Sequence, residues 1–143
     1  MPYLQLDTPF HHSDDDKRAL AKKFGEIYSV HMSANVNRLT VAIRELGEGG
    51  IWRCSEGDPY PAGILMLDIR EGRTAETREQ LAWKLVGACQ EILGFTNENL
   101  NVEFTQHKGD EMFHTKFGGL SDDWRAGEAD KFDALSGKGA VAG

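Results

Sequence analysis

Apolar and polar residues alternate along three short stretches of the chain, with the period of two that is typical of β-strands. These stretches are residues 3–7, 38–45 and 100–104. A fourth stretch, residues 64–69, is apolar at most of its positions, which predicts a strand buried at the centre of a sheet. Residues 46–61 are rich in glycine and proline and predict a loop with at most one small strand.

Two longer segments repeat their apolar residues every three to four positions, which predicts amphipathic helices. Ser13 and Thr74 precede these segments and are expected to cap the helices, because their hydroxyls can accept hydrogen bonds from the first turn. Gly94 follows the second segment and is a natural helix stop. The apolar positions are Leu20, Phe24, Ile27 and Tyr28 in the first helix and Leu81, Leu85, Ala88, Cys89 and Ile92 in the second.

One offset of 61 residues relates the two halves of the chain. It superimposes the cap Ser13 on Thr74, the alternating residues 39–43 on 100–104, and Pro2 on Gly63. The chain therefore reads as two β-α-β units, about 2–62 and 63–125, within a single domain of residues 1–125. Each unit has a long connection between its strands, so its two strands are expected to be parallel.

Two such units predict an α+β fold in which a four-stranded mixed sheet carries both helices on one face. The other face is expected to be apolar and uncovered, and such a face usually packs against a partner subunit. We therefore expect the protein to be oligomeric. Residues 126–143 end in a small, glycine-rich sequence and predict a flexible C-terminal tail.

Composition narrows the classes of function. The chain has 143 residues and a formal net charge of −7, and an acidic protein is a poor ligand for nucleic acids or anionic membranes. No apolar run is long enough to span a bilayer, and the N-terminus lacks the features of a secretory signal. The cysteines, Cys54 and Cys89, lie on unlike segments and are expected to be reduced, which fits a cytoplasmic protein.

Pro2 is the first candidate for chemistry. It follows the initiator methionine, and methionine before proline is normally removed in the cell, so the mature chain would begin with a secondary amine. An α-amino group titrates at a pKa of about 7.7–8.0, and burial or nearby cations lower that pKa further. Such an amine can act as a general base at cellular pH. Many proteins begin with Met-Pro, so this dipeptide indicates a catalytic amine only together with residues that could bind a substrate beside it.

Arg70 and Arg73 are the candidate partners, because they follow the predicted buried strand and precede the helix cap Thr74. Two guanidinium groups at a strand end and a helix N-terminus form a good carboxylate site. Arginine also offers bidentate contacts that lysine does not. The alternative is that both arginines are solvated surface residues of a loop.

Pro2, the doubled β-α-β pattern and residues 69–81 (IREGRTAETREQL) together resemble the 4-oxalocrotonate tautomerase superfamily. The chain is most similar to its fused, double-length members in the cis-3-chloroacrylic acid dehalogenase group, over about residues 2–124. The resemblance implies a tautomerase-like fold and a homotrimer of doubled protomers. It also implies that Pro2 acts as base, or as acid when protonated, on a small enol, keto or unsaturated acid whose carboxylate Arg70 and Arg73 bind.

Three positions of the dehalogenase group carry other residues in this chain. Tyr28 stands in place of a histidine, Glu103 in place of a tyrosine, and His114 in place of the water-activating glutamate. Glu111 lies close to His114 and is an alternative for that role. Glu103 is either an active-site carboxylate or a surface or interface residue. Tyr28 either packs in the core or hydrogen-bonds the substrate.

The sequence therefore predicts an isomerase of the tautomerase type. The alternatives are a hydratase, dehalogenase or decarboxylase on the same scaffold, and a non-catalytic trimeric binding protein. Neither a cofactor nor a metal is expected, because residues 11–16 (HHSDDD) read as a turn and helix cap and not as converging metal ligands. The catalytic candidates are Pro2, Glu103 and His114, and the substrate-binding candidates are Arg70, Arg73 and Tyr28.

Overall fold

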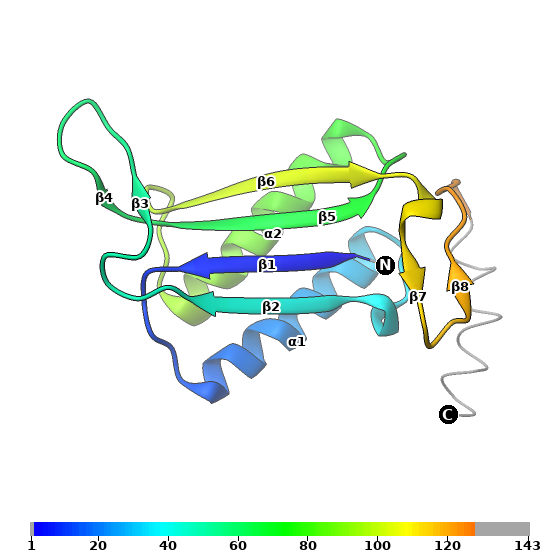
Figure 1. Cartoon of the computed structure of the whole chain (residues 1–143), viewed down its shortest axis with the longest axis horizontal. Coiled ribbons are helices and arrows are strands. Elements are labelled where there is room, and N and C mark those ends of the chain that lie inside the picture. Colours follow the sequence, from blue (N-terminus) through cyan, green and yellow to red (C-terminus); the bar gives the residue numbers. More distant parts are fainter. Residues whose placement is uncertain (1, 128–143) are drawn as a thin grey trace.

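The computed structural model describes residues 2–127, so most of the predicted tail lies outside the described residues. The long strands are β1 (Tyr3–Thr8), β2 (Thr40–Glu45), β5 (Gly63–Arg70) and β6 (Leu100–His107). The helices are α1 (Asp14–His31) and α2 (Ala75–Leu93), and the 3-10 turns are η1 (Val36–Arg38) and η2 (Gly109–Glu111). Two small hairpins lie at opposite ends of the sheet (Figure 1): β3 (Trp52–Arg53) with β4 (Tyr60–Pro61), and β7 (Phe113–His114) with β8 (Gly119–Leu120).

The long strands form one mixed sheet in the order β2-β1-β5-β6. Strands of the same unit are parallel, as predicted, with Leu4 opposite Val41 in the first unit and Leu65 opposite Val102 in the second. The offset of 61 residues maps one of these pairs onto the other. The two units meet through the antiparallel pairing of β1 with β5. The predicted four-stranded mixed sheet is therefore confirmed.

Both helices cover one face of the sheet and enclose the core (Figure 1). Ser13 Oγ accepts a hydrogen bond from the backbone N–H of Asp16 at 3.1 Å, and Thr74 Oγ1 accepts one from that of Thr77 at 3.2 Å. α2 ends at Gly94, whose φ of 79° lies in the left-handed region that favours glycine. None of the helices within residues 2–127 is long and apolar enough to cross a membrane. The fully buried side chains include Leu4, Leu6, Leu20, Phe24, Leu65, Leu67, Leu81, Leu85 and Cys89.

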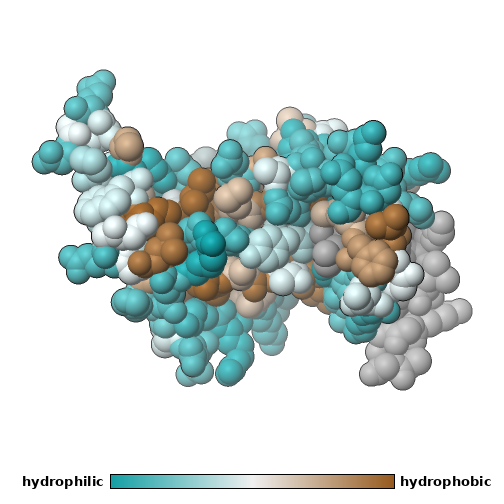
Figure 2. All heavy atoms as spheres, viewed as in Figure 1, coloured by the Kyte–Doolittle hydropathy of each residue, from teal (hydrophilic) through white to brown (hydrophobic). Residues whose placement is uncertain are grey.

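The opposite face of the sheet is uncovered, but it is not the apolar surface that the sequence predicted. Tyr3 Oη donates to Gln5 Oε1 at 2.9 Å along β1. Arg44 on β2 donates to both carboxylate oxygens of Asp7, at 2.6 and 2.9 Å. Figure 2 accordingly shows hydrophilic and hydrophobic residues mixed on this side. Because these polar groups bond to one another, they can be covered by a partner without losing their hydrogen bonds.

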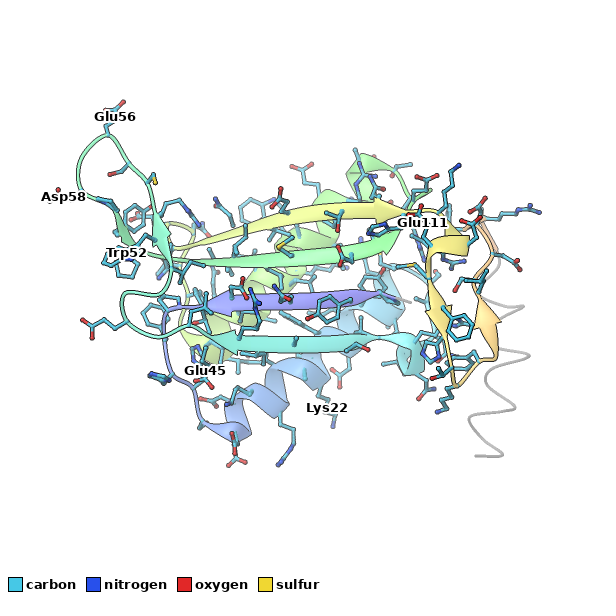
Figure 3. The ribbon with its side chains drawn as sticks, in the orientation of Figure 1. Lys22, Glu45, Trp52, Glu56, Asp58 and Glu111 are labelled. Atoms are coloured by element: carbon cyan, nitrogen blue, oxygen red, sulfur yellow. The ribbon has the colours of Figure 1, made fainter. Side chains whose placement is uncertain are left out.

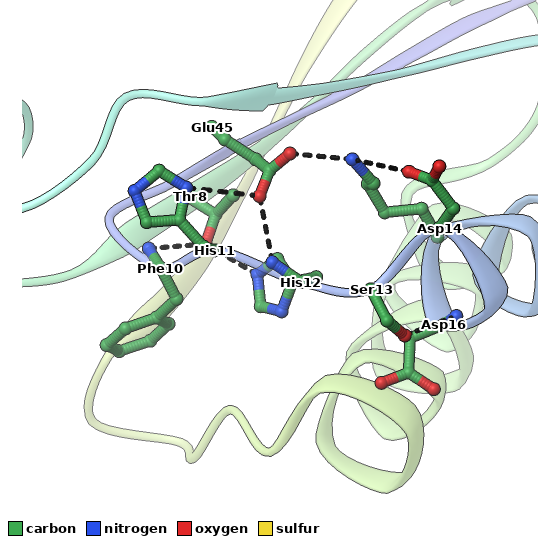
Figure 4. A network of polar contacts seen from close by, with 9 residues as sticks. Thr8, Phe10, His11, His12, Ser13, Asp14, Asp16 and Glu45 are labelled. Atoms are coloured by element: carbon green, nitrogen blue, oxygen red, sulfur yellow. Dashed lines mark hydrogen bonds and ion pairs between the residues drawn. The ribbon is translucent and has the colours of Figure 1, made fainter.

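A charged cluster ties the connection between β1 and α1 to the end of β2 (Figure 4). Glu45 accepts bonds from the Lys17 ammonium at 2.7 Å and from the backbone N–H of His12 at 2.8 Å. These two bonds lower the pKa of Glu45 from 4.5 to about 2. His12 Nε2 lies 3.0 Å from Thr8 Oγ1, and burial lowers the pKa of His12. The histidines and acidic residues that follow β1 therefore take part in hydrogen bonds and ion pairs that stabilise the connection between β1 and α1.

Glu45→Gln is expected to lower stability at neutral pH and to flatten the acid branch of the stability curve. A carboxylate whose folded-state pKa is depressed contributes stability above its unfolded pKa, and this contribution is lost as the pH falls from 4.5 toward about 2. Urea unfolding across this pH range measures the effect. Glu48→Gln, in the exposed loop after β2, is the control. Identical acid branches for Glu45→Gln and wild type would contradict the interpretation.

Candidate active site

A pocket lies at the end of the sheet where β1 begins. The β7–β8 hairpin lies at the same end of the sheet (Figure 1). The walls of the pocket come from the start of β1, the end of α1 with the turn that follows it, and the end of β5 with the loop that leads to α2. Four of the predicted site residues meet in this pocket, because Pro2, Tyr28, Arg70 and Arg73 all line it. The other lining residues are Ser33, Ala34, Asn35 and Arg38.

Pro2 is buried at the middle of this end of the sheet. Its carbonyl accepts a hydrogen bond from the backbone N–H of Thr40 at 3.1 Å, which ties it to β2. On the other side, β1 pairs with β5. Pro2 therefore stands between Arg38, which precedes β2, and Arg70, which ends β5. An amine at this position would face a pocket with positive charge on both sides.

Arg70 reaches the pocket from the end of β5, and Arg73 reaches it from the loop between β5 and α2. Arg73 is only 7% exposed, and its Nη2 donates to the carbonyl of Met32 at 2.8 Å. Arg70 Nη1 donates to the carbonyl of Asp122 at 2.6 Å. A guanidinium carries five N–H donors, so one bond to a backbone carbonyl is compatible with bidentate binding of a carboxylate. The positive end of the α2 dipole, directly after Arg73, adds to the attraction for an anion.

Arg38 is a third arginine of the pocket, and it was missed in the sequence. The alternation of residues 38–45 predicted that Arg38 begins a strand, but β2 begins at Thr40 and Arg38 ends the η1 turn. Asn35 caps this turn, because its Oδ1 accepts from the backbone N–H of Asn37 at 2.9 Å. Asparagine is a turn-forming residue, and this signal could have identified the turn. The Arg38 guanidinium lies 4.3 Å from the centre of the Phe117 ring.

Tyr28 lines the pocket from α1, although it is only 2% exposed. Burial raises the pKa of its hydroxyl to about 12, against the opposing effect of the Arg73 and Arg70 charges. The phenol therefore stays protonated at neutral pH and can donate a hydrogen bond to an anion. Tyr28 therefore packs in the core and also lines the pocket, and its predicted hydrogen bond to a substrate stays a prediction.

His114 lies on β7, close to the pocket but not in its lining. Its ring centre is 4.6 Å from that of Phe117, the residue over which Arg38 stacks. Burial, and then the Arg38 charge, lowers the pKa of His114. Its Nδ1 is buried and has no hydrogen-bond partner among the described residues. The imidazole is therefore neutral at physiological pH, beside a positively charged wall of the pocket.

Glu103 and Glu111 do not line the pocket. Glu103 is exposed in the middle of β6, on the uncovered face of the sheet, opposite Met66 of β5. Glu111 is exposed on η2 (Figure 3), where its Oε1 accepts from the backbone N–H of Lys108 at 3.2 Å. Within a single protomer, neither carboxylate belongs to the group of residues around Pro2.

The two ends of the sheet are equivalent positions of the duplicated chain, but they carry different side chains. At the opposite end, Gly63 occupies the position of Pro2 in the second unit. A Cβ atom on Gly63 would lie only 2.9 Å from Cε1 of Phe95, so the aromatic ring fills this end. Phe10 adds a second ring, with its centre 5.5 Å from that of Phe95. The two ends therefore differ, because three arginines line a pocket at Pro2, whereas at Gly63 aromatic rings fill the space and Arg53 donates to the glycine carbonyl at 3.0 Å.

The pocket favours small anions. Three arginines line it and, among the described residues, no acidic side chain does. Clustered charge of one sign in a concave site raises the local concentration of ligands with the opposite charge. Within residues 2–127, no group of three histidine, cysteine, aspartate or glutamate side chains is placed to hold a metal ion. The charge of the pocket therefore suits a small anion beside Pro2.

No protein-family model matches the sequence, and no curated protein matches it either. Solved structures do match. A member of the cis-3-chloroacrylic acid dehalogenase family superposes with a TM-score of 0.80 at 18% identity, covering 98% of both chains. A fused 4-OT symmetric trimer gives a TM-score of 0.72 at 20% identity, covering 83% of this chain and 94% of that one. Pt0534, inactivated by 2-oxo-3-pentynoate, gives 0.71 at 22% identity with the same coverage. The strand order, the two helices on one face and these superpositions show that the chain has the tautomerase superfamily fold.

Proposed function

We propose that this protein is a tautomerase that uses the amine of Pro2 as general base and general acid on a small enol or keto carboxylate. The observation that carries the proposal is the position of Pro2 between arginines of different elements in one pocket. Removal of Met1 would make Pro2 a secondary amine. Burial and positive neighbours favour the neutral form of that amine, which can accept a proton at cellular pH.

In the proposed reaction, Arg70 and Arg73 hold the carboxylate while the Pro2 amine removes the hydroxyl proton of the enol. The resulting ammonium then returns a proton to carbon, so the enol becomes a ketone with no net gain or loss of protons. Negative charge develops on the enolate oxygen between these two steps. The protonated Tyr28 hydroxyl lines the same pocket and would stabilise that charge.

Addition of water to an unsaturated acid, including hydrolytic dehalogenation, is a second candidate. The buried Nδ1 of His114, which has no hydrogen-bond partner among the described residues, favours it. A neutral imidazole can accept a proton from water. The water oxygen would bond to one alkene carbon as the imidazole takes a proton from that water, and protonated Pro2 would deliver a proton to the adjacent carbon. From a 3-chloroacrylate this gives a chlorohydrin, which loses chloride and the hydroxyl proton to form an aldehyde. The superposition on a cis-3-chloroacrylic acid dehalogenase family member supports testing this reaction.

We also infer that three copies of this chain assemble. The fused 4-OT protein that superposes on it is a symmetric trimer. The uncovered face of the sheet, with its mixture of paired polar and apolar side chains, is the surface that an assembly would enclose. Sedimentation equilibrium measures the mass directly, and a monomer would contradict this inference without affecting the chemistry proposed at Pro2.

The test of the proposed function is turnover of phenylenolpyruvate and 2-hydroxymuconate by the mature protein. The isomers of 3-chloroacrylate serve as probes for water addition. The proposal predicts saturable conversion of at least one enol to its ketone. Absence of turnover with both enols would contradict the tautomerase proposal. Turnover of a chloroacrylate alone would favour water addition, and no turnover of any of these compounds would favour a non-catalytic binding protein.

Arg38→Ala is expected to lower kcat/KM for 2-hydroxymuconate by about 10- to 150-fold, the equivalent of one charged hydrogen bond. Arg38 lies on the opposite side of Pro2 from Arg70, so a substrate with a carboxylate at each end can reach both. Phenylenolpyruvate has a single carboxylate and is expected to lose much less. Arg18→Ala, on the exposed surface of α1, is the control. Equal losses with both substrates would show that Arg38 does not select the second acid group.

A further inference from the structure

Residues 121–124, which we call the clamp segment, contact Arg70 at the end of β5 and Arg73 in the loop that follows. Arg70 Nη1 donates to the Asp122 carbonyl at 2.6 Å. The Arg73 guanidinium carbon lies 4.8 Å from the centre of the Trp124 ring, within the range of a cation–π contact. One short segment therefore contacts both residues that the proposed function uses for the carboxylate.

Two glycines allow the clamp segment to approach this closely. Gly72, between the two arginines, has a φ of 127°, and a Cβ atom there would lie 2.9 Å from the Trp124 ring. A Cβ atom on Gly109 would overlap the backbone of Asp122. The backbone N–H of Gly109 also donates to Asp123 Oδ1 at 2.9 Å, which fixes the segment from its other side. The path of the clamp segment therefore depends on Gly72 and Gly109, which lie in two separate segments of the chain.

We propose that Trp124 is a positioning residue that fixes the guanidinium plane of Arg73 for the substrate carboxylate. This inference rests on the proposed function, in which Arg73 binds that carboxylate. Arginine has a long, flexible side chain, and holding its fork in one orientation before binding reduces the entropy lost in a bidentate contact. The Met32 carbonyl restrains one end of the Arg73 fork at 2.8 Å, and the Trp124 ring restrains its face.

Two substitutions separate the contribution of the bulk of Trp124 from the contribution of its aromatic face. Trp124→Leu keeps apolar bulk but removes the aromatic face, and we expect it to raise KM by about 3- to 30-fold, the range of a cation–π contact. Because the contact is present before and during the reaction, kcat should change little. Trp124→Phe keeps a ring and should restore most of the affinity. Trp83→Ala, which removes a 61% exposed tryptophan of α2, is the matched control.

Urea unfolding of each variant verifies that it is folded. Calorimetric titration with maleate, which has no enol to convert, measures the Kd, and product analysis of the titrated sample checks that no water has added to its double bond. A raised KM and Kd in Trp124→Leu, with recovery in Trp124→Phe, is the expected result. Wild-type values in a folded Trp124→Leu protein, or a fall in kcat alone, would overturn the positioning role. If wild type binds maleate but converts no substrate, the proposed function fails and the Kd values alone decide the role of Trp124. If wild type neither converts a substrate nor binds maleate, both the proposed function and the positioning role of Trp124 fail.

Discussion

A chain that keeps one residue in front of Pro2 is expected to lose about 10²- to 10⁴-fold in kcat, the usual contribution of general acid–base catalysis. A peptide bond to the prolyl nitrogen removes its basicity, so neither proton transfer of the proposed reaction can occur. The fold should be unaffected, because Pro2 is tied to β2 through its carbonyl and the Thr40 N–H. Parallel kinetics of the extended and mature chains with phenylenolpyruvate measure the loss.

Pro2→Ala supplies the graded control for this experiment. After removal of methionine, the alanine chain still begins with an amine, although a primary one without the ring. It should therefore retain more activity than the extended chain and less than wild type. For the mature wild type, kcat/KM should rise with pH as the amine loses its proton. Full activity in the extended chain would rule out Pro2 as the base.

Arg73→Ala is expected to lower kcat/KM by about 10- to 150-fold, the range for losing hydrogen bonds to a charged partner. Arg73 is nearly buried in the pocket wall, so the substitution removes a positive charge from the interior of the pocket. Most of the loss should appear in KM, because the carboxylate is bound equally before and during proton transfer. The substitution also leaves the Met32 carbonyl without this donor, which costs about 1–3 kcal/mol of stability when such a group stays buried.

Arg73→Lys separates charge from geometry. Lysine keeps the positive charge but has no planar fork for a bidentate carboxylate contact. Recovery of only part of the lost affinity is therefore expected, with stability measured by urea unfolding of both variants. Arg18→Ala, on the exposed surface of α1, controls for a general loss of positive charge. A KM of Arg73→Ala equal to that of wild type would place the carboxylate elsewhere.

The elements of this fold follow from local features of the sequence, and the pairing of strands follows from their repetition. Ser13, Thr74 and Gly94 mark helix boundaries by their own chemistry, and the offset of 61 residues then predicts two parallel pairs. The character of the uncovered face does not follow in this way. Asp7 and Arg44 are 37 residues apart, and only the register of β1 with β2 brings them together as an ion pair.

The residues of the candidate site also differ in whether the sequence predicts their positions. Pro2, Arg70 and Arg73 stand directly at the ends of strongly patterned elements, so their positions could be predicted. Arg38 and Trp124 lie in irregular segments, whose paths depend on contacts far away in the sequence. Trp124 meets Arg73 because two glycines in other loops leave room for it, and no periodic pattern contains that information.

The most direct test of Pro2 as the catalytic amine is peptide mass spectrometry after incubation with 2-oxo-3-pentynoate, the compound that inactivates Pt0534. Its alkyne is conjugated to a ketone beside a carboxylate, so a neutral amine can add to the alkyne carbon while a proton goes to the adjacent carbon. Cys54 is an exposed thiol that could also react, so Cys54→Ser is measured in parallel. We predict one added molecule on the peptide that begins with Pro2 in both proteins. Adducts confined to Cys54, or a Pro2 peptide that stays unmodified or still carries Met1, would contradict the central claim.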